Sequence, residues 1–365
     1  MKTLAAACIL FAATLPANAE DPLLNETVEF TGQIFYLDSA VPGLVIGAIR
    51  NGETAVFGFG ETAKGSGKEP DGETRIGVGS ITKTLTGLSL AHLVADGKVA
   101  LSDPASKWND DLKGLPQGEG RSIRLIDLVT HSSGLPRDLF PGEEKEGKTF
   151  PASAEDLALL YPPGKGILYS NVGFDVLGQA LQGAAGKSYT EFLKERVLDP
   201  LGMTSTGYDR PANDNTMTGY DWNGDKMEPR VRPPEKFGAS WIFTTPNDML
   251  RYLAWNLDRF GEDGMEARRL SHAVWLQRDG LSPVYGLDES GHMDAMGLGW
   301  VVMMPEGDRP LLLQKAGGSD GIFSYIAFAP ARGVGAFIAI NQYNFAAGME
   351  MAHVINDLIA TLAPR

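Results

Sequence analysis

Strand-like segments stand at both ends of this chain, and that placement limits its possible folds more than any other feature. Two β-prone runs, 44–50 and 53–59, flank the pair Asn51-Gly52. An Asn-Gly pair between such runs is the strongest short-range signal for a β-hairpin, because its turn needs positive φ angles. Four short apolar runs separated by turn residues predict further strands at the other end of the chain: 298–304, 311–316, 322–329 and 334–341.

The long stretch between these strands has apolar residues at helical spacing and many loop signals. Strands at both ends with helices between them predict an α+β fold, in which one antiparallel sheet is built from both chain ends and flanked by helices. We expect the sheet region to comprise residues 20–100 and 240–365, and a mainly helical insertion to comprise 101–239. A final helix over 346–362 would close the chain.

The first residues have the pattern of an export signal. Lys2 gives a positive start, an apolar run follows from 4 to 15, and Ala17-Asn18-Ala19 matches a cleavage site. We therefore expect residues 1–19 to be a signal peptide. The one cysteine, Cys8, lies inside it, so the exported chain would hold no disulfide. No other apolar run approaches the ~20 residues that a membrane-spanning helix needs, so no integral membrane segment is expected.

Bulk composition narrows the range of partners. A chain of 365 residues, 43% of them hydrophobic, can bury a large core. Its formal net charge of -14 argues against nucleic acid and anionic membrane surfaces as partners. The 5 histidines show no metal-binding spacing such as His-Glu-x-x-His, so we expect neither a metal nor a cofactor.

Ser80 stands where a glycine-containing stretch, 77–79, meets a predicted helix, and Lys83 follows one turn later. Residues three apart share a helix face, with roughly 5–6 Å between their Cβ atoms. A serine hydroxyl needs a base to become a nucleophile, and a lysine kept neutral by burial can act as that base. The helix N-terminus would also stabilise a developing oxyanion. On spacing alone, a capping serine followed by a surface lysine is the simpler interpretation.

Two further clusters carry groups that this chemistry would need. Tyr169 and Asn171 supply a phenol that can relay protons and an amide that can hold a substrate carbonyl. Their structural alternative is a packed aromatic residue beside a helix cap. Lys315 precedes two glycines at the end of a predicted strand. It offers positive charge next to an open backbone, and its structural alternative is to guard a sheet edge.

In this order, Ser-x-x-Lys, Tyr-x-Asn and Lys-x-Gly resemble the three signatures of the serine β-lactamase and penicillin-binding protein superfamily. The Tyr-x-Asn form is similar to the class C β-lactamase branch, and within it to the D-alanyl-D-alanine carboxypeptidase/endopeptidases. The flanking stretches 128–136, 200–203 and 297–300 are also similar to that branch. The resemblance covers nearly the whole chain after the signal peptide.

The resemblance implies a role for each residue. Ser80 would be the acylated nucleophile, and Lys83 with Tyr169 would form the base and proton relay. Asn171 would orient the substrate amide.

The opposite wall of the cleft would bind the substrate. There Lys315 would help meet its carboxylate, and the N–H of Gly318 would complete an oxyanion hole with the N–H of the nucleophile. One residue departs from the signature, because Ala316 stands where a hydroxyl residue usually follows the lysine. Loss of that hydrogen bond would weaken carboxylate recognition by on the order of 1–3 kcal/mol. Ser319 is near enough in sequence to compensate.

The implied function is that of a periplasmic serine hydrolase that forms an acyl-enzyme on D-Ala-D-Ala peptides of peptidoglycan and binds β-lactams. It would act as a DD-carboxypeptidase, and cleavage of peptide cross-links as a DD-endopeptidase is left open. A class C-type β-lactamase, an esterase of the same fold and a non-catalytic sensor of wall fragments are the alternatives. A Ser-His-Asp hydrolase is less favoured, because no Gly-x-Ser-x-Gly elbow surrounds Ser80 and a structural hydrogen bond explains His131 better.

Overall fold

The computed structural model describes residues 21–138, 157–209, 215–230, 238–288 and 290–363 of the chain. The expected signal peptide, residues 1–19, lies outside this part. Across the described ranges, no helix combines the length and the apolar character that crossing a membrane requires.

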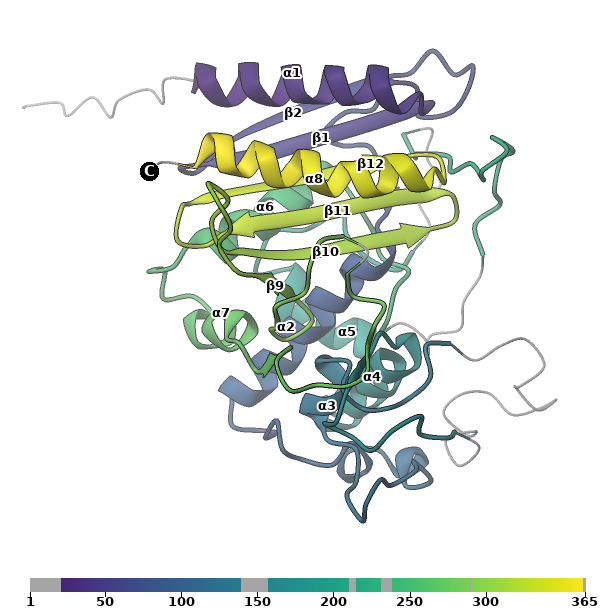
Figure 1. Cartoon of the computed structure of the whole chain (residues 1–365), viewed down its shortest axis with the longest axis vertical. Coiled ribbons are helices and arrows are strands. Elements are labelled where there is room, and N and C mark those ends of the chain that lie inside the picture. Colours follow the sequence, from purple (N-terminus) through teal and green to yellow (C-terminus); the bar gives the residue numbers. More distant parts are fainter. Residues whose placement is uncertain (1–20, 139–156, 210–214, 231–237, 289, 364–365) are drawn as a thin grey trace, which may run out of the picture.

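An antiparallel sheet of eight strands dominates the described residues, in the order β2-β1-β12-β11-β10-β9-β8-β6. The first hairpin, β1–β2, pairs with the last strand, β12, so both chain ends build one sheet (Figure 1). The predicted α+β architecture is confirmed. The strands are β1 (Gly43–Arg50), β2 (Glu53–Gly60), β6 (Leu276–Gln277), β8 (Ala295–Met296), β9 (Val301–Met303), β10 (Leu312–Ser319), β11 (Ile322–Ala329) and β12 (Val334–Ile340).

The predicted hairpin forms because its turn residues suit the required backbone. Asn51 has a φ of 52° and Gly52 a φ of 87°, which is the positive region that Asn and Gly tolerate best. Alternate residues of β1 then enter two separate cores. Val45 and Ile49 join the core on the α2 and α6 side, whereas Leu44 joins the core under α1 and α8.

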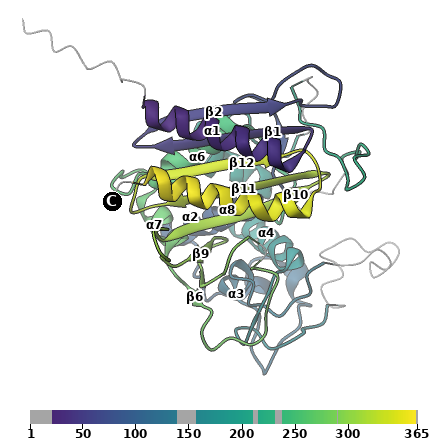
Figure 2. The same cartoon turned by 45° about the horizontal axis from the view of Figure 1, so that its top comes forward.

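The two helical layers cover opposite faces of the sheet. Helices α1 and α8 lie side by side over one face, and α6 packs against the other (Figures 1 and 2). Helix α2 belongs to the core on the α6 side of the sheet and is buried along most of its length. The helices are α1 (Pro22–Ser39), α2 (Thr82–Ala95), α3 (Leu125–Val129), α4 (Asn171–Ala185), α5 (Tyr189–Leu193), α6 (Pro246–Leu257), α7 (Met265–His272) and α8 (Phe345–Leu362).

One predicted strand, 298–304, is wrong in its bounds. The chain forms β8 and β9 around a turn, and the turn contains most of the first half of that predicted strand. Gly299 lies in the turn with a φ of 81°, and a Cβ there would come within 2.5 Å of the carbonyl oxygen of Lys83. The strand is therefore interrupted where the backbone must approach α2 closely.

Two short strand pairs lie outside the main sheet and frame the region around Ser80. Strand β3 (Ile76–Gly77) pairs with β5 (Phe243–Thr244) just before the serine. Strand β4 (Ile167–Leu168) pairs in parallel with β7 (Val284–Tyr285) just before Tyr169.

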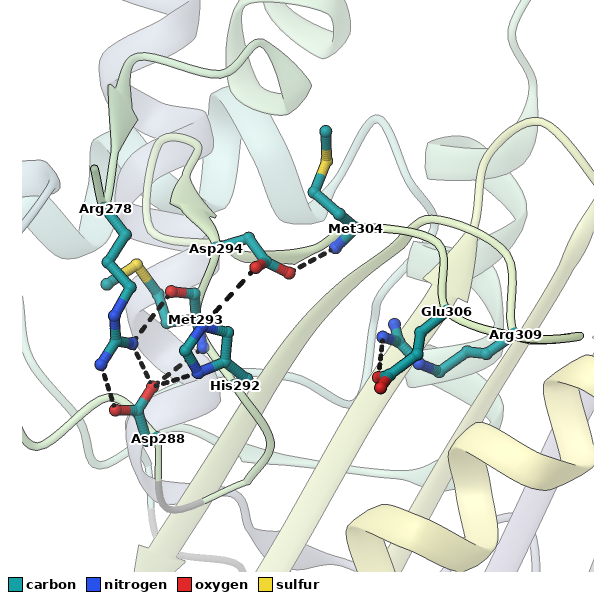
Figure 3. Close-up of polar contacts among 8 residues, drawn as sticks. All are labelled: Arg278, Asp288, His292, Met293, Asp294, Met304, Glu306 and Arg309. Atoms are coloured by element: carbon teal, nitrogen blue, oxygen red, sulfur yellow. Dashed lines mark hydrogen bonds and ion pairs between the residues drawn. The ribbon is translucent and has the colours of Figure 1, made fainter.

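Ion pairs brace the segment that follows β7 (Figure 3). Arg278 donates to both carboxylate oxygens of Asp288, at 2.6 and 2.9 Å, and also to the carbonyl oxygen of Met293 at 3.1 Å. The His292 ring lies between Asp288 and Asp294, at 3.8 and 3.6 Å. These contacts connect the end of β6, at the edge of the sheet, to the segment that follows β7, the strand that pairs with β4.

Candidate active site

Ser80 lies in a 3-10 turn, Gly79–Ile81, that connects β3 to the first residue of α2. Gly79 is required there for two reasons: its φ is 52°, and a Cβ would lie 2.3 Å from the carbonyl oxygen of Gly318. The turn is thus pressed against the backbone of β10. Ser80 is half-buried, so its hydroxyl lies at the boundary between the protein interior and solvent.

Lys83 lies on the first turn of α2, fully buried, and its Nζ is 3.1 Å from the Oγ of Ser80. Nζ also donates to Asn171 Oδ1 and to the carbonyl oxygen of Ala239, each at 2.7 Å. Burial lowers the pKa of Lys83 to about 7, while the carboxylates of Asp175 and Asp138 act in the opposite direction.

The three neighbours of Nζ are oxygen atoms that can each accept from a protonated amine, and they can also accommodate a neutral one. A neutral amine has two N–H bonds and one lone pair. The two carbonyl-type oxygens, of Asn171 and Ala239, take the two N–H groups at the shorter distances. The lone pair is then left for the hydroxyl of Ser80. This geometry matches what a serine needs from its base.

Tyr169 also contacts Ser80 and donates its hydroxyl hydrogen to Oγ at 2.6 Å. Its backbone N–H donates to the carbonyl oxygen of Tyr285, which fixes it to β7. Basic groups lie around the ring: the Nζ atoms of Lys83 and Lys315 and the guanidinium of Arg137 are 4.9, 5.1 and 4.9 Å from its centroid. The charges of Lys315 and Arg137 favour the negative charge that develops on Oγ during attack.

Asn171 begins α4, but it is not the helix cap that one alternative predicted. Ser170 is the N-cap, and its Oγ accepts from the N–H of Gly173 at 2.8 Å. The amide of Asn171 is used elsewhere: Oδ1 accepts from Lys83, and Nδ2 donates to Asp138 Oδ1 at 2.7 Å. Asn171 therefore orients the lysine amine in this structure.

β10 forms the opposite wall, and its residues alternate between the two faces of the sheet. Lys315 and Gly317 face the serine: Lys315 Nζ lies over the Tyr169 ring, and a Cβ on Gly317 would lie 3.1 Å from the backbone nitrogen of Ser80. Ser319 lies on the same face, since its Oγ is 3.4 Å from where a Cβ of Gly77 would be.

Ala316 lies on the other face. Its side chain packs against the core under α1 and α8, and Gly318 beside it is exposed. A hydroxyl at position 316 would therefore point away from Lys315, whereas the buried Ser319 shares the face of that lysine. Gly318 packs on the serine turn, because a Cβ on Gly79 would lie 2.7 Å from the Gly318 nitrogen.

Three residues that sequence reasoning left outside the site contribute to it. Ala239 acts through a backbone carbonyl, for which a sequence carries no signal. Arg137 and Asp138 directly follow the turn that resembles the family, and two adjacent charges there were a usable signal. Asp138 holds Asn171, and Arg137 lies against the Tyr169 ring.

His131 is a structural neighbour of the site. It is buried, with a φ of 58°, and its Nδ1 accepts from the backbone N–H of Ser170 at 3.0 Å. Its ring stacks on Tyr169 with centroids 4.6 Å apart. Burial, aided by the positive charge of Lys83, holds the pKa of His131 well below its usual range, so the ring is neutral. His131 thus supports the backbone that carries Tyr169 and Asn171.

Comparisons with known proteins place the chain in a known family. A family model described as "Beta-lactamase" matches residues 20–360, so the chain belongs to the beta-lactamase family. It is 31% identical, over 346 residues, to the D-alanyl-D-alanine-carboxypeptidase/endopeptidase AmpH of Escherichia coli K12, covering 92% of this chain and 88% of that protein.

Solved structures share the fold. A beta-lactamase/D-alanine carboxypeptidase from Yersinia pestis, complexed with citrate, superposes with a TM-score of 0.82 at 30% identity and covers 93% of this chain and 98% of its own. A class C beta-lactamase gives a TM-score of 0.80 at 20% identity, with 96% and 99% coverage. The resemblance predicted from three short motifs is confirmed.

Proposed function

We propose that this protein is a serine-type D-Ala-D-Ala carboxypeptidase with endopeptidase activity that acts on peptidoglycan peptides and is acylated by penicillins. One observation carries the proposal: the Ser80 hydroxyl lies within hydrogen-bond distance of both a buried lysine amine and a tyrosine hydroxyl. The similarity to a D-alanyl-D-alanine-carboxypeptidase/endopeptidase supports the substrate class. The signal-like residues 1–19 support a periplasmic location.

Acylation begins when the neutral amine of Lys83 takes the proton of Ser80 and Oγ attacks the scissile carbonyl carbon. Negative charge then develops on the carbonyl oxygen, and the backbone N–H groups of Ser80 and Gly318 would stabilise it. The Tyr169 hydroxyl gives its proton to the leaving nitrogen as the C–N bond breaks, and the Lys83 ammonium, which holds the serine proton, returns a proton to the tyrosine. Water later attacks the Ser80 ester, and its proton returns to Oγ as the acid leaves.

Two substrate contacts complete the proposal. The Nδ2 group of Asn171 is held by Asp138, which is half-exposed, and a substrate carbonyl would replace that carboxylate as its acceptor. Lys315 would meet the substrate carboxylate on the serine face of β10, together with the hydroxyl of Ser319.

The proposal is tested with pentapeptide and cross-linked muropeptides, with products identified by mass spectrometry. Release of D-alanine and cleavage of cross-links are expected from the wild type, together with labelling by a fluorescent penicillin. Ser80→Ala should lose both, while Ser66→Ala, a change at an exposed loop serine, should retain them. Labelling of the Ser80→Ala variant at the wild-type rate would remove Ser80 from the nucleophile role.

The second candidate is a β-lactamase or an esterase of the same fold, and the similarity to beta-lactamases favours it: the chain is 25% identical over 356 residues to a beta-lactamase of Pseudomonas fluorescens. Rapid turnover of nitrocefin would indicate the lactamase. Hydrolysis of short p-nitrophenyl esters without D-alanine release would indicate the esterase, and tight muropeptide binding without any product would indicate a wall-fragment sensor.

A further inference from the structure

An exposed cluster of aromatic rings lies on the face of the sheet opposite the serine, next to the reactive part of β10. Trp222 and Phe345 are 56% and 66% exposed, and their rings stack with centroids 4.9 Å apart. Tyr343 contacts Trp222 at 5.2 Å and Phe323 at 4.8 Å. We call these four residues the aromatic platform. Large rings left exposed in contact with one another are typical of a binding surface.

The platform is continuous with the candidate active site. Phe323 on β11 is the register partner of Gly318 on β10, and a Cβ on Gly318 would lie 3.3 Å from its ring. Ala316 packs into the same face. Tyr343 is fixed in place because its N–H donates to the carbonyl oxygen of Tyr220 at 2.8 Å.

The reactive half of β10 has an open edge. Strand β9 pairs with β10 only at Leu312–Gln314, so among the described strands 315–319 has a neighbour on the β11 side alone. An extended substrate can add to such an edge, and its successive side groups then point to alternate faces of the sheet. The attacked carbonyl must face Ser80. The substituent one position away from it then points toward the platform.

We infer that the aromatic platform is a subsite for an aromatic or other apolar ring on the substrate, one position from the scissile carbonyl. The inference rests on the proposed acylation of Ser80. On the face of β10 that carries Ala316, the substrate would be recognised by contacts with rings and not by a hydrogen bond between a hydroxyl and a carboxylate.

Two penicillins that differ by one ring provide the test. Benzylpenicillin carries a phenylacetyl group, and 6-aminopenicillanic acid lacks it. The ratio of their second-order acylation rate constants measures what the ring contributes, and any loss of folded protein cancels in it. We expect the ratio to fall about three- to tenfold in Phe345→Ala and in Trp222→Ala, the range of one aromatic contact. Phe260→Ala, which removes an exposed ring elsewhere, should keep the wild-type ratio.

A wild-type ratio in both platform variants would overturn the inference while leaving the acylation of Ser80 standing. Absence of acylation by either compound would instead overturn the proposed function. In that case calorimetry on Ser80→Ala tests the subsite. The dissociation constants of the two compounds are measured for this protein with and without the platform and control substitutions, and their ratios are compared. A higher ratio of the benzylpenicillin to the 6-aminopenicillanic acid dissociation constant, seen only in the platform variants, supports the subsite, and an unchanged ratio rejects it.

Discussion

The rate at which Ser80 is acylated should depend on the protonation state of Lys83. Burial lowers the pKa of this amine from 10.5 to about 7, and only the neutral amine has a lone pair for the serine proton. The amine loses its proton as the pH rises. The acylation rate should therefore rise with pH through about 7 and level off above it.

The size of the effect follows from a single titration. With a pKa of about 7, about 9% of the amine is neutral at pH 6 and about 91% at pH 8, so the rate constant should differ about tenfold. The buried histidines do not titrate in this pH range. Burial lowers the pKa of His92 to about 4 and that of His272 to about 3, and His131 is also shifted well downward.

Stopped-flow labelling with a fluorescent penicillin between pH 5 and 9 measures the profile, with circular dichroism at each pH to confirm folding. Two variants test the assignment in opposite directions. The Asp175 carboxylate raises the pKa of Lys83 and the Arg137 guanidinium lowers it, so Asp175→Asn should move the midpoint down and Arg137→Gln should move it up. A flat profile, or a midpoint that ignores both changes, would refute Lys83 as the titrating base.

Further predictions concern stability and placement. Relative to Lys83→Met, the wild-type free energy of unfolding should increase with pH between about 7 and 10.5, by up to about 1.4 kcal/mol per pH unit. In this range the unfolded chain still holds the Lys83 proton that the folded chain has lost. Urea titrations at several pH values measure the difference. His131→Ala should lower the acylation rate more than His131→Asn, whose amide oxygen can still accept from the N–H of Ser170, and equal rates would contradict the positioning role. Gly317→Ala places a Cβ 2.0 Å from a backbone oxygen beside the serine and should reduce penicillin labelling by about 100-fold, whereas Gly318→Ala meets only a ring at 3.3 Å and should label far better.

Local rules predicted much of the fold. The Asn51-Gly52 turn predicted the first hairpin, and strand β11 was predicted with its observed bounds. Helix α1 was not predicted, because its pattern is not amphipathic in the usual sense. Its buried face includes Gly32, where a Cβ would lie 2.5 Å from the Phe59 ring, while Phe30 is exposed. Tertiary packing, which periodicity does not contain, selects that face.

The candidate site likewise contains residues that the sequence predicted and others that it could not predict. Residue type and order predicted Ser80, Lys83 and Tyr169 as site residues, because the proposed chemistry needs a nucleophile, a base and a relay, and the structure brings the three side chains together. The carbonyl of Ala239 could not be predicted, since every residue has a carbonyl and its position depends on a loop distant in sequence. The neutral state of Lys83 was expected from a buried helix, but its acceptors required the structure.

The alternation of β10 changes the meaning of the sequence's one departure from the family signature. Read as a string, Ala316 adjoins Lys315 and suggests a damaged carboxylate site. In the sheet the two side chains point to opposite faces, and the serine face retains Lys315 and Ser319. Under the proposed mechanism, acylation would therefore depend on one face of the strand, and the inferred aromatic subsite would select the substituent on the other. A change at position 316 should alter which substrates acylate Ser80 and leave the pH midpoint set by Lys83 in place.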